Sequence, residues 1–401
     1  MKVPAHRIDL DREALTRVLT RKLTELLRQP EHASHDGFRS YMAEADGTPV
    51  VRLSVANCEP GMDIWQGLRS PAKVGLYPVG LEDIWRHYAA ANVSSTRYDG
   101  SPNPLAMPEP FEGALKRYKR AVILSAMLAI DPGVFESYAE KIDQGDLDPV
   151  DDYCRARTET AKLIDKALGR LSLGLMAEDR IVVPMTGDNV AKVIDGSRGA
   201  YSKGKYHGPC NSHYPQNSVA VLTGLLRFGV SRLPFRDEIG PDGKVRRLMG
   251  RYASIVIFDQ QEPVKDGRGG MQLLNGERLK VMVRLNDYTH ADEQSIADRY
   301  CTYNLTSQGG QSVCGKCIVD CLSGALGNSS PSPAGQYAPR LLEQKHRFSD
   351  EWLDFDFGNC GRERGQKAQI YPEYECGRCE AICAARGIRK SPAEIRRINE
   401  A

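Results

Sequence analysis

The spacing of apolar residues predicts several helices along the chain. Residues 11–28 carry Leu and Val at intervals of three and four, and Asp11 stands at the N-cap position of the helix that this spacing favours. A longer helix is predicted over residues 149–172, with Asp148 as N-cap and Pro149 at the first helical position. Its expected inward stripe is Tyr153, Ala156, Thr160, Leu163, Ala167 and Leu171. Shorter helices are predicted over residues 81–91, 218–226 and after the N-cap Ser391.

Short apolar runs between these helices predict β-strands. The run from Ala121 to Ala129 is apolar at almost every position, which is typical of a strand buried on both faces. Because strands and helices are mixed along the chain, the predicted fold class is α+β, with an α/β-like core. The other predicted strands are residues 49–56, 74–79, 181–185, 254–259 and 279–285.

The pattern changes near residue 286, where periodicity weakens and Cys, Gly and polar residues accumulate. The proline-rich stretch 95–110 is interpreted as a loop or a linker. A chain of 401 residues exceeds the usual size of a single core, so we expect two or three domains. The predicted division is an N-terminal α/β region (1–115), a central core (116–285) and a cysteine-rich C-terminal module (286–401).

Composition and charge narrow the class of protein. The chain has 41% hydrophobic residues, 54 basic and 52 acidic side chains, so it lacks the excess of positive charge typical of polyanion-binding proteins. A local basic patch is compatible with this balance, so composition does not decide whether nucleic acid is a partner. The first residues lack the apolar stretch of a secretory signal, and no run reaches the roughly 20 apolar residues of a membrane span. We therefore expect a cytoplasmic protein without a membrane partner.

The chain has 11 cysteines, and seven of them lie between Cys314 and Cys383. Disulfides rarely persist in a reducing cytoplasm, so a cluster of this kind indicates a metal site. Two segments repeat the spacing C-x2-C-x3-C, namely Cys314–Cys321 and Cys376–Cys383. Thiolates are soft ligands that suit iron–sulfur clusters.

In two-cluster ferredoxins the last cysteine of each motif ligates the cluster of the other motif. Applied here, this rule predicts two four-iron four-sulfur (4Fe-4S) clusters. The second of them lacks a local fourth ligand because Gln311 stands three residues before Cys314, where a further cysteine is usual, and Cys301 is the candidate replacement. Without Cys301, that centre would have an open or oxygen-ligated iron, or be a three-iron cluster. The first predicted ligand set is Cys321, Cys360, Cys376 and Cys379, and the second is Cys314, Cys317, Cys383 and Cys301.

The alternative for the same cysteines is a structural zinc site built from the two C-x2-C pairs. That interpretation leaves the matching Cys321 and Cys383 without a role. The remaining cysteines, Cys58, Cys154 and Cys210, are interpreted as small, partly buried thiols without a chemical role.

Two cluster motifs appended to an α/β region resemble the epoxyqueuosine reductase and reductive dehalogenase superfamily, whose members use a corrinoid supplied with electrons by two 4Fe-4S clusters. The motif that ends Cys321-Leu-Ser-Gly-Ala-Leu is similar to the family's Cys-Pro-Thr-Gly-Ala-Ile. The stretch Thr223-Gly-Leu-Leu-Arg-Phe-Gly-Val-Ser231 is similar to a segment near the corrinoid, and Asp152-Tyr153-Cys154 to an Asp-Tyr-His that supplies a catalytic acid. The chain departs from the family at Leu322 and Ala384, which stand where prolines are usual, at Cys154 in place of His, and at Leu226 in place of Gly.

The resemblance implies a reductase-like core over residues 116–285 and a ferredoxin-like module with two 4Fe-4S clusters over residues 286–401. It also implies a cobalamin-dependent oxidoreductase with Asp152 or Tyr153 as the proton donor. Both residues also have an interpretation without a catalytic role. Asp152 would be a solvated carboxylate in the first turn of a helix, and Tyr153 would be a core residue whose hydroxyl is hydrogen-bonded. Gly224 and Gly229 would let a planar cofactor approach the backbone, or only make turns. The segment 201–214, rich in Gly, His and Tyr, is either a cofactor-pocket wall or an exposed loop. The candidate cofactor-binding residues are Gly224, Gly229, Ser231, His207 and His213.

The function that follows is reduction of a small organic molecule, organohalide-like, or of an epoxide or modified nucleoside. The expected partner is a low-potential electron donor of the ferredoxin or flavodoxin type. One alternative is an electron-transfer protein of the two-cluster ferredoxin type without a corrinoid, although two clusters need far fewer than 401 residues. Another is a zinc-stabilised interaction module without redox activity.

Overall fold

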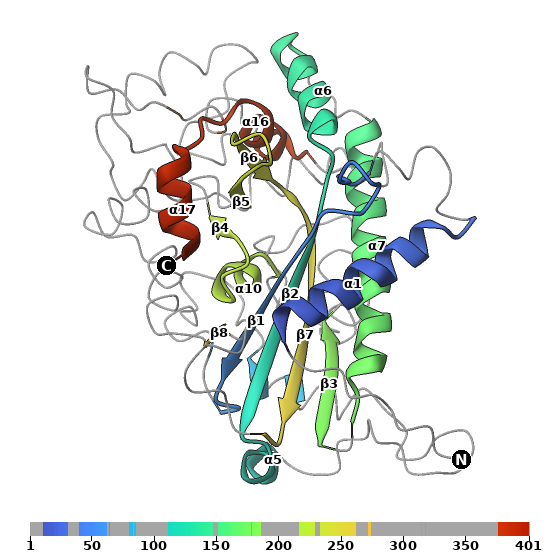
Figure 1. The fold of residues 1–401 in the computed structure, drawn as a ribbon, viewed down its shortest axis with the longest axis vertical. Helices are drawn as coiled ribbons and strands as arrows, with labels where there is room; N and C mark the ends of the chain where they lie inside the picture. The colour runs from blue at the N-terminus through green and yellow to red at the C-terminus, as the bar shows by residue number, and fades with distance from the viewer. Residues whose placement is uncertain are drawn as a thin grey trace, which may run out of the picture.

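The described part of the chain forms a mixed α+β structure, seen in the computed structural model as a long sheet with helices packed on it (Figure 1). The fold class predicted from the sequence is therefore confirmed at the level of α+β. The described residues are 11–30, 40–61, 64, 80–82, 84–85, 111–146, 151–177, 179–185, 216–228, 233–261, 272–273, 314, 317 and 376–400.

The main sheet has five strands in the order β3-β7-β2-β1-β8. Its central strand β2 (Arg120–Ala129) pairs antiparallel with β1 (Val51–Cys58) on one side and with β7 (Gly250–Asp259) on the other. β3 (Arg180–Met185) extends the antiparallel pairing beyond β7, and the short β8 (Gln272–Leu273) runs parallel to β1. Every residue of β2 is buried, as its apolar sequence predicts for a strand covered on both faces.

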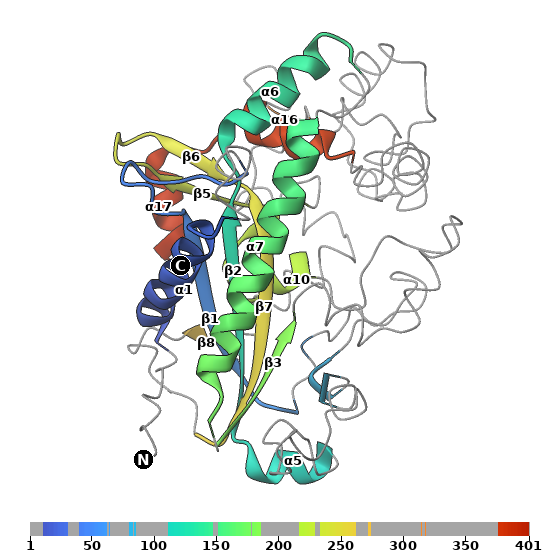
Figure 2. The ribbon, with the colours of Figure 1, turned by 90° about the vertical axis from the view of Figure 1, so that its right-hand side faces the viewer.

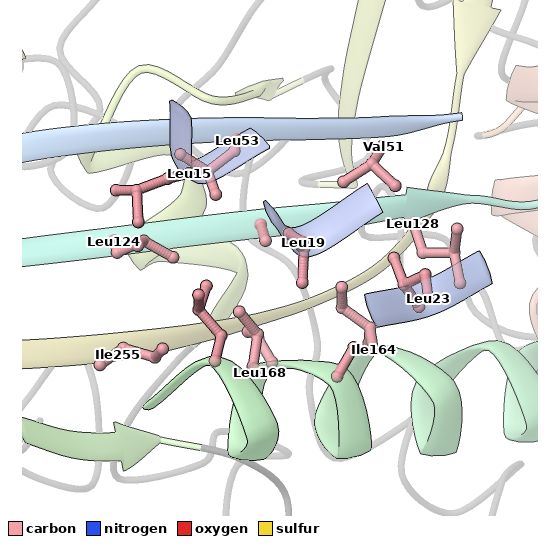
Figure 3. Packing of buried hydrophobic residues seen from close by; sticks show 14 of the residues in the cluster. Leu15, Leu19, Leu23, Val51, Leu53, Leu124, Leu128, Ile164, Leu168 and Ile255 are labelled. Atoms are coloured by element: carbon pink, nitrogen blue, oxygen red, sulfur yellow. The ribbon is translucent and has the colours of Figure 1, made fainter. Parts of the chain in front are cut away.

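Two helices, α1 (Arg12–Leu27) and α7 (Asp151–Leu175), pack together on one face of this sheet (Figure 2). The predicted N-cap of α1 is confirmed, because the Asp11 side chain accepts a hydrogen bond from the backbone N–H of Ala14 at 2.8 Å. Leucines spaced four residues apart on α1 point into the same apolar layer as Ile164 and Leu168 of α7 (Figure 3). The predicted inward stripe of α7 is also confirmed, since all six of its members are buried.

The opposite face of the sheet is covered in part by α10 (Gln216–Leu222), which contacts β7 and β2. The Ser54 hydroxyl of β1 donates to the Thr223 hydroxyl at 2.9 Å and ties the end of α10 to the sheet. Farther along this face, the Trp85 ring meets the Phe258 ring edge-on at 5.0 Å between centroids. The helix α5 (Phe111–Arg117) adds Phe111 and Ala114 to the same apolar cluster.

A small second sheet consists of β4 (Arg227–Phe228), β5 (Pro234–Ile239) and β6 (Val245–Leu248). The last helix, α17 (Pro392–Glu400), packs against β5. Its predicted capping is confirmed, because the backbone N–H of Ser391 donates to the Glu394 carboxylate at 2.9 Å and the Ser391 hydroxyl accepts from the Glu394 N–H at 3.4 Å.

At one end of the main sheet, α6 (Pro132–Asp143) and α16 (Arg378–Arg386) lie beside the first turns of α7 (Figures 1 and 2). These helices share one apolar cluster that includes Phe135, Tyr138, Tyr153 and Ile382. The sequence analysis did not predict α6, although Asp131 caps it and Pro132 occupies its first turn. It is this end of the fold that carries the second cysteine motif.

Most predicted elements within the described residues correspond to observed ones. The predicted strands 49–56, 181–185 and 254–259 match β1, β3 and β7. The predicted helix 218–226 corresponds only in part to α10, which ends at Leu222 and is followed by a turn with Gly224 at φ +78°. The predicted strands 74–79 and 279–285, the caps Asp148 and Pro149, and most of the predicted helix 81–91 lie outside the described residues.

The predicted boundary after residue 115 separates two strands that pair in the main sheet. The first and second predicted domains meet at residue 115, but β1 from the first pairs along its whole length with β2 from the second. These two regions therefore share a single sheet and a common core. From the third range, α16 and α17 pack against elements of the second.

A buried ion cluster holds three strand ends together. The Asp259 carboxylate, at the end of β7, accepts hydrogen bonds from Arg120 of β2 at 2.8 Å and from Arg180 of β3 at 3.1 Å. The three residues are direct neighbours across the sheet, and all three side chains are at least 97% shielded from solvent. One carboxylate therefore compensates two buried guanidinium groups.

Among the described helices, none has both the length and the apolar character needed to cross a lipid bilayer.

Candidate metal centre

Five of the eight predicted ligand cysteines belong to the described residues, and all five are thiols: Cys314, Cys317, Cys376, Cys379 and Cys383. Cys317 is buried, and the other four are partly buried. The remaining predicted ligands, Cys301, Cys321 and Cys360, lie outside the described residues. Within the described residues, no group of three or more His, Cys, Asp or Glu side chains is arranged to hold a metal ion.

The second motif is built around the start of α16. Gly377 is the N-cap and has φ +55° and ψ +5°, a left-handed conformation that glycine adopts without the strain a side chain would add. Cys376 stands just before this turn, and Cys379 and Cys383 follow in the helix. Because they are four residues apart, Cys379 and Cys383 lie on the same side of α16.

Hydrogen bonds to the backbone fix α16 against its neighbours. The Tyr138 hydroxyl of α6 donates to the Cys376 carbonyl oxygen at 2.6 Å. At the end of α6, the Asp146 carbonyl oxygen accepts from the Arg378 guanidinium at 2.8 Å. Each bond joins the cysteine motif to a segment more than 200 residues earlier in the chain, so the core determines where the motif sits.

Tyr153 belongs to a buried polar network between α7, β7 and α16. Its hydroxyl donates to the Glu380 carboxylate at 2.6 Å and accepts from Arg157 at 2.8 Å. Arg251 donates to the same carboxylate at 3.0 Å. Burial, more than any neighbouring charge, raises the pKa of the Tyr153 phenol well above its usual value. These contacts match the interpretation of Tyr153 as a core residue with a satisfied hydroxyl.

Asp152, the other candidate proton donor, is exposed in the first turn of α7. Its neighbour Tyr153 points into the core, so the two candidates do not face a common site. A carboxylate in this position interacts favourably with the positive end of the helix dipole.

Arg247 of β6 contacts the second motif directly, and sequence reasoning missed it. Its Nη1 donates to the Cys383 sulfur at 3.2 Å and lies 3.4 Å from the Cys383 carbonyl oxygen. The Asp237 carboxylate holds the other side of the guanidinium through two bonds of 2.7 and 2.8 Å. Burial alone would lower the pKa of Arg247, but its interactions with Cys383 and with the Asp237 carboxylate outweigh burial and raise that pKa.

A sequence signal for this pair did exist. Asp237 and Arg247 are cross-strand partners in the hairpin of β5 and β6, whose turn contains Gly243 at φ +75°. The sequence Gly240-Pro-Asp-Gly243 is a turn signal, and a hairpin closed there brings the opposite charges on its two strands face to face.

The Cys383 thiol has a raised pKa. Burial is the main cause, and the neighbouring Arg247 guanidinium acts in the opposite direction and lowers it.

Of the candidate corrinoid-binding residues, only Gly224 is described. It has φ +78° in the turn after α10, and its carbonyl oxygen accepts from Arg227 at 3.1 Å. The turn itself accounts for glycine at this position. Gly229, Ser231, His207 and His213 lie outside the described residues.

Two cysteines outside the motifs are described. Cys58 is buried in the main sheet, where its thiol donates to the Ala121 carbonyl oxygen at 3.6 Å. Burial raises the pKa of this thiol to about 12, so it remains protonated at neutral pH. Cys154 packs partly buried against the cluster shared by α6, α7 and α16. Both positions agree with the expected structural role, and Cys210 lies outside the described residues.

Comparison of the chain with models of protein families, with curated proteins and with solved structures gives no match.

Proposed function

We propose that this protein is an iron–sulfur oxidoreductase that binds two 4Fe-4S clusters through its paired cysteine motifs. The observation that carries the proposal is the repeated C-x2-C-x3-C spacing of Cys314–Cys321 and Cys376–Cys383. In two-cluster ferredoxins the last cysteine of one motif serves the cluster of the other. The proposed ligand set of that centre is Cys314, Cys317 and Cys383, with Cys301 as the fourth ligand.

The surroundings of the motifs also suit a cluster. The described candidate ligands are all sulfur atoms, and soft thiolates suit iron–sulfur clusters. An N–H group of Arg247 already points at one of these sulfurs, at 3.2 Å from Cys383. Donors of this kind are typical of the shell around ligand thiolates, where they offset the negative charge of cluster and ligands. Cys321, Cys360, Cys376 and Cys379 would hold the other cluster.

The sheet of residues 51–259 would form the reductase core on which this centre is mounted. By resemblance, the core would hold a cobalamin near Gly224, together with Gly229 and Ser231. When bound, the corrinoid supplies the metal that reduces the substrate. The chain would bind and shield the substrate, a small organohalide-like molecule, an epoxide or a modified nucleoside. A ferredoxin or flavodoxin would deliver the electrons.

The experiment that tests the proposal is metal analysis of the full chain after anaerobic expression and purification. We expect about eight iron and about eight sulfide ions per chain, with cobalt after reconstitution with cobalamin. Iron and sulfide without retained cobalamin would refute the corrinoid part and leave an electron carrier. Zinc without sulfide would refute the proposal and favour a structural zinc module.

The ligand assignment is tested by single substitutions followed by electron paramagnetic resonance (EPR) spectroscopy. Cys314→Ala and Cys383→Ala should perturb the same centre, and Cys376→Ala should perturb the other. Cys58→Ala is the control, since this thiol lies in β1, where it donates to the Ala121 carbonyl oxygen, and it should leave both signals unchanged. If Cys383→Ala instead affects the same centre as Cys376→Ala, the crossed assignment is wrong.

A further inference from the structure

We propose that Arg247, oriented by Asp237, is a positioning residue that donates a hydrogen bond to the Cys383 sulfur and raises the reduction potential of the centre that this sulfur ligates. The inference rests on the proposed function, because it concerns one of the two proposed clusters. It goes beyond that function by predicting that the two centres differ in potential and by naming the side chain responsible.

Protein contacts other than the cysteine hold the guanidinium in place. Asp237 holds it through two parallel hydrogen bonds, and the Phe235 ring lies beneath it at 4.1 Å from the ring centroid. Gly387 leaves room on the far side, because a Cβ at that position would lie 2.6 Å from Arg247 Nη1. The Arg247 side chain is 3% exposed, so water competes little for its donors.

This orientation leaves one edge of the guanidinium for the cysteine. Nε and Nη2 are bound to Asp237, and Nη1 is directed to the Cys383 sulfur and carbonyl oxygen. The carboxylate lies on the opposite side of the guanidinium from the sulfur. The Cys383 sulfur therefore faces the positively charged member of the Arg247–Asp237 pair, although the pair as a whole is neutral.

A hydrogen bond and a positive end at this place favour the reduced cluster. Reduction adds one electron from the external donor, and part of the added negative charge resides on the ligand sulfurs. A donor fixed in a water-poor site stabilises that added charge without having to reorganise. The reduced form gains more than the oxidised form, so the potential of this centre rises relative to a cluster without the contact.

A matched control stands next to Arg247 on the same strand. Arg246 pairs with Glu238 at 2.7 Å and with Glu44 at 3.4 Å, on the other side of the hairpin from Cys383. Both residues carry one positive charge in β6, but only Arg247 has a recorded hydrogen bond to a cysteine among the described residues. Arg247→Gln and Arg246→Gln therefore remove the same charge from neighbouring positions. Only Arg247→Gln also removes the contact to the Cys383 sulfur.

The experiment is an EPR-monitored redox titration of the full chain, loaded anaerobically with its clusters, for the wild type and three variants. We expect Arg247→Gln to shift one midpoint potential to more negative values and to leave the other unchanged. Arg247→Lys should shift the same midpoint by less, because lysine keeps the charge but loses the forked geometry. Arg246→Gln should leave both midpoints at their wild-type values.

The outcomes separate this inference from the proposed function. A wild-type chain without iron and sulfide would refute the function itself. Two intact clusters with the same midpoints in the wild type and in Arg247→Gln would refute only the role of Arg247, as would a shift confined to the centre that Cys376→Ala perturbs. If Arg247→Gln fails to hold the cluster, the midpoint potential of Arg247→Lys is the test. A midpoint potential in Arg247→Lys equal to that of the wild type would overturn the proposal.

Discussion

Replacing Gly377 with alanine should detach the second cysteine motif from the core and reduce the free energy of unfolding by about 2–5 kcal/mol. The backbone there has φ +55°, and a left-handed conformation costs a residue with a side chain about 1–2 kcal/mol. The new Cβ would also collide with the hydroxyl and ring of Tyr153, which are fixed in the core, and such overpacking costs about 1–3 kcal/mol. Chemical denaturation of Gly377→Ala measures the loss, and iron content after anaerobic loading should fall with it.

Gly145→Ala is the matched control for this variant. Gly145 has φ +81°, but a Cβ at that position would have no atom within 4 Å. It should therefore lose only the backbone contribution of about 1–2 kcal/mol. Equal losses in Gly145→Ala and Gly377→Ala would contradict the claim that Tyr153 fills the space beside Gly377.

Asp259→Asn should destabilise the protein by about 3–5 kcal/mol, because it removes a buried carboxylate that pairs with both Arg120 and Arg180. Asparagine keeps the shape of the side chain, so the loss comes from charge and not from a cavity. Both guanidiniums are almost fully shielded from water, and neither can regain hydration without opening the sheet. Thermal and chemical denaturation both measure this loss.

Glu140→Gln on the exposed side of α6 removes the same charge at the surface and should change stability by less than about 0.5 kcal/mol. Because the Asp259 cluster is buried, raising the salt concentration should leave the difference between Asp259→Asn and the wild type nearly unchanged. A difference that disappears in high salt would contradict a buried pair.

Local signals explain which parts of the fold could be predicted. Asp11 caps α1, and Ser391 with Glu394 caps α17. Both caps could be predicted because each hydrogen bond joins residues only three positions apart in the sequence. The continuous apolar run of β2 is typical of a central strand, in which both faces are buried. The hairpin of β5 and β6 was missed because its strands are short and rich in charged residues, so periodicity gives little indication of them.

The candidate site could be predicted only as far as its cysteines. Their spacing is local, so it can be read directly from the sequence. Arg247 lies 136 residues from Cys383, and Tyr153 lies 227 residues from Glu380, so no local pattern relates them. Tyr153 illustrates the limit, since the same residue was predicted both as part of an inward stripe and as a proton donor, and only the fold showed its partners.

The docking of α16 on α6 has a consequence for the order in which the protein is made. Translation proceeds from the N-terminus, so the sheet and α6 emerge from the ribosome long before residues 376–386 are synthesised. Until then, the apolar surface of α6 and α7 that α16 later covers stays exposed on the nascent chain. If the motifs bind iron and sulfide as proposed, cofactor insertion at the second motif must follow the synthesis of residues 376–383. A nascent chain stalled before α16 should present this apolar surface to chaperones.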